Sequence, residues 1–89
     1  SLNQNYPNPF NPTTEIGYSI PEDTFVSITI YDVKGRSVKS LVNQSQDAGI
    51  YLTNWNAKNE QGVLVPAGMY YYTIRAGDFT QTKKMILLK

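Results

Sequence analysis

The residue types that most often carry catalysis are scarce in this sequence. It contains no histidine and no cysteine, so neither a Ser-His-Asp nor a Cys-His arrangement can be built, and thiolate zinc sites are excluded. A serine–lysine pair is formally available at Ser37, Lys39 and Ser40, but these residues fall on a predicted strand with solvated polar positions. Glu22 and Asp23 are neighbours in a turn, whereas glycosidic catalysis needs two carboxylates facing one cleft. We therefore expect no enzymatic activity.

Oxygen-rich loops are the candidates for a metal site. Asp47 with the amides beside it, or Asn56, Asn59 and Glu60, offer the oxygen ligands that Ca²⁺ prefers. Neither loop has the regular spacing of an EF-hand. The six glycines are spread singly and form no phosphate-binding loop. We expect neither a metal nor a cofactor.

A run of three tyrosines is the main candidate for ligand binding by stacking. Tyr70, Tyr71 and Tyr72 could form a glycan platform together with Trp55. Strand alternation, however, places Tyr70 and Tyr72 on one face and Tyr71 on the other. Packing in the core is therefore the preferred interpretation, and a carbohydrate-binding accessory module is kept as an alternative.

The overall composition is that of one small domain. The chain has 89 residues, of which 40% are hydrophobic, and a formal net charge of +1; this is enough apolar material for one core. Its charges are spread along the chain, so composition favours neither nucleic acid nor a charged membrane as a partner. No apolar run approaches the roughly 20 residues of a membrane-spanning helix.

The elements that position these residues are predicted to be strands. Hydrophobic residues alternate with a period of two, and no stretch of helical length has a period of 3.6. Asp32-Val33-Lys34-Gly35 fits a type I turn, and polar loops are predicted at 43–49 and 56–62. Strands are predicted at 15–20, 26–31, 37–42, 50–55, 68–74 and 79–88, with a short edge strand at Val63–Val65. This pattern predicts an all-β, Ig-like antiparallel sandwich of about seven short strands.

A proline-rich leader, residues 1–13, precedes the sandwich at residues 14–89. It contains the stretch NYPNPFNP, in which each proline fixes its φ angle and removes a backbone donor. We expect an extended, stiff ribbon that packs on the domain through Tyr6 and Phe10. Such a ribbon would cap an open edge of the sandwich, and its prolines would block further strand pairing there.

Four stretches resemble, in order, the type A C-terminal sorting domain of the type IX secretion system. They read NYPNPFNPTTEIGYSIP, VSITIYDVKGRSVKSL, GIYLTNWNAKNEQGVLVPAGMYYYTIRAG and TKKMILLK. The middle of the chain is also similar to the Ig-like modules of flagellar hook-cap proteins, which share the pattern YDxxGxxV and a Gly-x-Tyr-x-Tyr strand. The resemblance covers nearly the whole chain.

The resemblance implies a function that the residue chemistry does not. The chain would be a non-catalytic signal that directs an upstream cargo protein across the bacterial outer membrane. Its partners would be the outer-membrane translocon and a sortase-like peptidase that removes the domain. The destination would be the cell surface or the medium, reached through the periplasm, and the leader would join cargo to sorting domain. The segment recognised by the translocon would be Lys83, Lys84, Met85, Ile86, Leu87, Leu88 and Lys89.

The predicted last strand is compatible with such a role. Met85–Leu88 carries apolar residues on both faces, which is more than a one-sided sheet edge needs. One face could pack in the core while the other face, or an exposed edge, is presented to a partner by strand addition. The alternative is a central strand buried on both sides. For the whole chain, the alternative to sorting is a structural Ig-like module that spaces or assembles extracellular domains.

Overall fold

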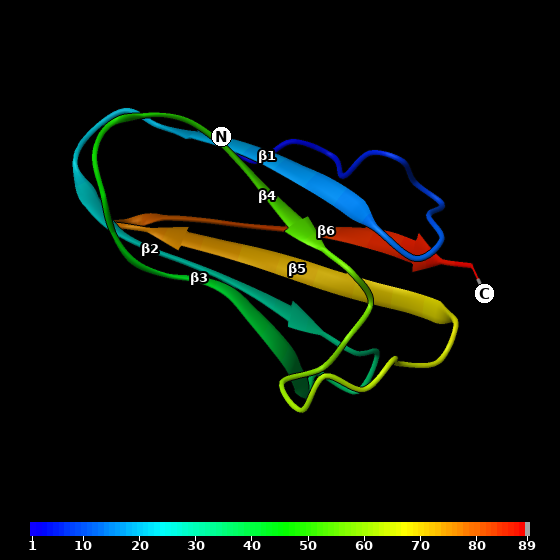
Figure 1. Cartoon of the computed structure of the whole chain (residues 1–89). Helices are drawn as coiled ribbons and strands as arrows, with labels where there is room; N and C mark the ends of the chain where they lie inside the picture. The colour runs from blue at the N-terminus through cyan, green and yellow to red at the C-terminus, as the bar shows by residue number, and fades with distance from the viewer. Residues whose placement is uncertain (89) are drawn as a thin grey trace.

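The computed structural model describes residues 1–88, which form two antiparallel sheets packed face to face (Figure 1). The strands are β1 (Thr14–Ile20), β2 (Thr24–Tyr31), β3 (Ser37–Gln46), β4 (Gly49–Trp55), β5 (Gly68–Ala76) and β6 (Phe79–Leu87). One sheet pairs β1 with β4, and the other has the order β3-β2-β5-β6. The predicted all-β, Ig-like class is confirmed, with six strands in the described part of the chain instead of about seven. No helix formed by residues 1–88 is long and apolar enough to cross a membrane.

The core forms because alternate residues of the strands point between the two sheets. Along β1, β2 and β5 the inward positions are almost all β-branched or aromatic, and each is buried. Such side chains pack well on a pleated surface. Trp55, from the end of β4, lies among them with its ring centroid 5.4 Å from that of Tyr70 and 5.8 Å from that of Phe10. The inward set includes Ile16, Tyr18, Ile20, Val26, Ile28, Ile30, Tyr70, Tyr72 and Ile74.

Two predictions about the strands were wrong: one end of a strand and one short strand. The loop predicted at 43–49 is strand up to Gln46, because β3 is an edge strand whose polar end pairs with β2 without entering the core. The short strand predicted at Val63–Val65 is absent from the described chain, where only an isolated bridge joins Lys58 to Leu64. That loop closes on itself: the Val65 amide donates to the Ala57 carbonyl, 2.9 Å away.

The leader contacts the strands through isolated bridges, of which the last joins Phe10 to Leu87 on β6. Leu2 and Tyr6 make antiparallel bridges to β1, after which the chain bends at 7–9 and 11–12. The leader is therefore extended at its start and bent further along. Of its two aromatic side chains, Phe10 is buried at 1% exposure, whereas Tyr6 is 78% exposed. Figure 1 shows the leader turning beside the end of β6.

A buried tyrosine fixes the leader to the core. The Tyr72 hydroxyl donates to the carbonyl of Asn3 and accepts the amide of Asn5, both at 2.8 Å. The side chain of Asn5 is itself buried and donates to Thr14 Oγ1 at 3.0 Å. Because buried polar groups are costly unless they are bonded, these contacts fix where the leader lies. The leader thus fills the space between the outer edges of β1 and β6.

Candidate recognition surface at the last strand

The two faces of β6 have different environments. Met85 and Leu87 point inward and are 0% and 4% exposed, whereas Ile86 on the opposite face is 41% exposed. Lys84 is also exposed, and Lys83 is half-buried. Because β6 pairs only with β5 within its sheet, the alternative of a central strand buried on both faces was wrong. Of the predicted recognition segment, Lys89 lies outside the described residues.

The edge of β6 is hydrogen-bonded to the leader. The Ile86 amide donates to Asn8 Oδ1 at 3.0 Å, and the Ile86 carbonyl accepts from the Phe10 amide at 3.0 Å. Next along the strand, the Leu88 amide donates to the Phe10 carbonyl at 2.8 Å. Upstream, Gln4 Nε2 donates to the Lys84 carbonyl at 2.9 Å. The leader therefore occupies the hydrogen-bonding edge of the last strand from Lys84 to Leu88.

These leader contacts could not be read from the sequence. Gln4 and Asn8 lie 80 and 78 positions from their partners on β6. Single amide side chains in a proline-rich segment indicate a turn and nothing about a distant strand. The prolines predicted that the leader would be irregular, but the strand it would cover depends on the tertiary fold.

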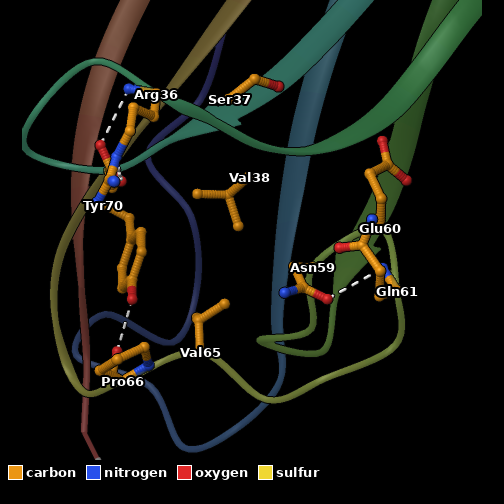
Figure 2. A pocket seen from close by; sticks show the side chains of 10 residues that line it. Arg36, Ser37, Val38, Asn59, Glu60, Gln61, Val65, Pro66 and Tyr70 are labelled. Carbon is orange, nitrogen blue, oxygen red and sulfur yellow. Dashed lines mark hydrogen bonds and ion pairs between the residues drawn. The ribbon is translucent and has the colours of Figure 1, made fainter.

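A cavity of about 410 Å³ lies between the β2–β3 turn and the loop that precedes β5 (Figure 2). Val38 and Val65 lie in its middle, and the Tyr70 ring forms one wall. The Tyr70 hydroxyl donates to the Pro66 carbonyl at 2.6 Å. Burial raises the pKa of Tyr70, so this hydroxyl is a neutral structural donor at physiological pH.

The two acidic residues of this cavity are engaged in local structure. Asp32 Oδ1 accepts the amides of Lys34 and Arg36, and Asp32 Oδ2 pairs with Arg36 Nε at 2.9 Å. Glu60 Oε2 accepts the Ser40 amide at 2.9 Å, on the edge of β3. These backbone hydrogen bonds hold the pKa of each carboxyl below its usual range. Both acids therefore order turns and strand edges.

The other candidates for chemistry are not assembled into sites. Lys39 Nζ lies 3.4 Å from Glu60 Oε1, so the lysine of the serine–lysine candidate forms an exposed ion pair. Among residues 1–88, no three His, Cys, Asp or Glu side chains gather as metal ligands would. Asn59 Oδ1 accepts the amides of Gln61 and Val63, which uses this proposed calcium ligand within its own loop.

The glycan platform is contradicted by burial. Trp55, Tyr70 and Tyr72 are 1%, 6% and 0% exposed, and Tyr71 lies on the opposite face of β5, half-buried. The Trp55 indole also donates internally, to the Lys58 carbonyl at 3.0 Å. No coplanar aromatic surface is therefore offered to a sugar by these four residues.

Comparison with known proteins supports the fold. None of the curated proteins matches the sequence. PorZ, a surface component of the type IX secretion system of Porphyromonas gingivalis, superimposes with a TM-score of 0.69 and 19% sequence identity. The match covers 97% of this chain and 11% of PorZ. Latent dimeric PorU of the same organism superimposes with a TM-score of 0.71 and 22% sequence identity. The match covers 96% of this chain and 9% of PorU.

FlgD from Pseudomonas aeruginosa is a third structural relative. Its TM-score is 0.65 at 22% identity, over 85% of this chain and 64% of FlgD. The chain thus spans less than two thirds of each of these three proteins. The sequence model of the FlgD Ig-like domain matches residues 10–78. This match covers more than half of the sequence, and the chain therefore belongs to the FlgD Ig-like domain family.

Proposed function

We propose that this domain is a sorting signal that sends an upstream cargo protein through the type IX secretion system. The observation that carries the proposal is the last strand. The segment that resembles the system's recognition signal is an edge strand, whose Lys84 and Ile86 side chains reach solvent. The structural likeness to PorZ, a surface component of that system, is consistent with the proposal.

In this proposal the domain is a substrate of the machinery and has no catalytic role. Its partners are the outer-membrane translocon and a sortase-like peptidase, and its destination is the cell surface or the medium. Because the leader is packed on the sandwich through Phe10 and Tyr72, the domain reaches the translocon as a folded body. The leader is then part of this folded body.

A structural Ig-like module is the second candidate. The match to the FlgD Ig-like domain favours it, because that match ends at residue 78 and does not include β6. A spacer of this kind needs only a stable sandwich and no specific surface on the last strand. The two candidates therefore differ in whether export depends on the translocon.

A secretion assay distinguishes them. A reporter with a periplasmic signal peptide is fused to residues 1–89 and expressed in a host with the type IX machinery, and in the same host without its translocon. We expect the reporter at the surface or in the medium only in the first host. An intact, folded fusion that stays in the periplasm of both hosts would contradict the proposal. A fusion to residues 1–84 is a poorer test, because it also removes the buried Met85 and Leu87.

A further inference from the structure

Three sides of the last strand differ in how accessible they are. The inward side chains, Met85 and Leu87, are buried in the core. The backbone edge from Lys84 to Leu88 is bonded to the leader. Strand addition by a partner would require the leader to leave, which would uncover Phe10 and break its contact with Trp55. The face that a partner can reach in the folded domain is therefore the outward face.

The outward face of β6 continues onto β5. Ile86 is paired across the strands with Met69, and Lys84 with Tyr71. Met69 and Ile86 are 38% and 41% exposed, Tyr71 is half-buried, and Lys84 is exposed. Cross-strand partners have their Cβ atoms about 5 Å apart on one face. Met69, Tyr71, Lys84 and Ile86 thus form one contiguous surface, called here the outward patch.

The charged residues on the outward face of these strands are of one sign. The strands β2, β3, β5 and β6 contain no aspartate or glutamate. Of their basic residues, Arg75 and Lys84 lie on the outward face, whereas Lys39 and Lys83 are paired with the buried Ile30 and Tyr72 on the opposite face. Six of the seven acidic residues lie in turns and loops, and the seventh, Glu15, is on β1 in the other sheet. An apolar patch on such a sheet complements a surface with apolar side chains bordered by carboxylates.

We infer that the outward patch is the surface by which the secretion machinery recognises the folded domain, through a protein partner with an apolar, acid-rimmed site. The inference rests on the proposed function and deepens it in two ways. The partner contacts side chains of the outward patch, and the leader stays bound to the edge of β6. It also includes Met69 and Tyr71, which belong to β5 and precede the last strand in sequence, so the signal is a folded surface and not a linear tail.

The test uses glutamate substitutions in the reporter fusion to residues 1–89. Met69→Glu and Lys84→Glu place a carboxylate against the expected acidic rim, so each should lower export by about tenfold or more, as at a binding hot spot. Leu52→Glu is the matched control for Met69→Glu, because Leu52 is 66% exposed on β4 of the other sheet. Lys58→Glu is the control for Lys84→Glu, because Lys58 is an exposed lysine in the loop that follows β4. Both controls should be exported like the unmodified fusion.

Each outcome decides the inference. Thermal unfolding of the purified domains must first show that the variants are folded. Normal export of folded Met69→Glu and Lys84→Glu would overturn the inference while leaving the proposed function intact. Retention of the unmodified fusion would overturn the proposed function and the inference with it. A purified domain that is dimeric, and that Met69→Glu makes monomeric, would show that a second copy covers the patch and would also overturn the inference.

Discussion

At the scale of single residues, Tyr72 joins the leader to the core strand β5. It lies on β5 with its ring fully buried, and its hydroxyl bonds two backbone positions of the leader, Asn3 and Asn5. Burial raises the pKa of Tyr72 to about 12, although the bond from the Asn5 amide lowers it somewhat. The phenol is therefore kept neutral, as its role as donor to Asn3 requires.

This pKa shift predicts a loss of stability in alkali. The unfolded-state pKa of tyrosine is about 10, and the folded-state value is higher, so the stabilisation is complete below about pH 10 and is lost as the pH rises through about 12. The melting temperature should fall over this range. Tyr72→Phe should be less stable at pH 8, because it leaves Asn3 and Asn5 without their partner, but its further loss in alkali should be smaller.

The same comparison separates Tyr72 from the other buried phenols. Burial also raises the pKa of Tyr18 and Tyr70, and these residues titrate in both proteins. Equal losses of melting temperature in the wild-type and Tyr72→Phe proteins between about pH 10 and about pH 12 would refute the assignment. Fluorescence or circular dichroism melts in that range are sufficient to measure it.

At the scale of elements, the leader acts as an additional edge element between the sheets. It bonds β1 on one side, through Tyr6 and Glu15, and β6 on the other, through Phe10 and Ile86. Open strand edges invite pairing with other chains, and the leader covers two of them with a segment whose prolines cannot extend a ladder. The packing of Phe10 against Trp55 is the apolar part of this closure.

Removing that packing should destabilise the whole domain. Phe10→Ala deletes a ring that is 1% exposed, and large-to-small changes of this kind cost about 3–5 kcal/mol. Equilibrium unfolding in urea measures the change. Tyr6→Ala, in the same segment but at a residue that is 78% exposed, should change the free energy of unfolding by no more than about 0.5 kcal/mol. A Phe10→Ala protein as stable as Tyr6→Ala would mean that the leader is not part of the folding unit.

The strands with a buried face were predictable and the edges were not. Ile16, Tyr18 and Ile20 on β1 alternate because one face of that strand is buried, so their period predicts both strand and core. The polar end of β3 at 43–46 has no such signal, since an edge strand can pair through its backbone alone. The outward exposure of Ile86 follows from alternation. The hydrogen bonds to the Ile86 backbone come from Asn8 and Phe10, and only the tertiary fold places these two residues beside β6.

At the scale of the whole molecule, the fold is shared by proteins with different roles. The chain belongs to the FlgD Ig-like domain family, and PorZ, which has the same fold, is a surface component of a secretion system. A sandwich can serve both, since function lies in surfaces placed on a fold. For this chain, the surface proposed to carry the sorting role is the end of β6 and the strand beside it.

The most direct test of the sorting role exchanges one family member for another. A reporter with a periplasmic signal is fused either to residues 1–89 or to the matching Ig-like domain of Pseudomonas aeruginosa FlgD, and its location is measured in a host with the type IX machinery. The sorting account predicts that only the fusion to residues 1–89 reaches the surface or the medium. Retention of both folded fusions in the periplasm, or export of both to the same extent, would contradict it.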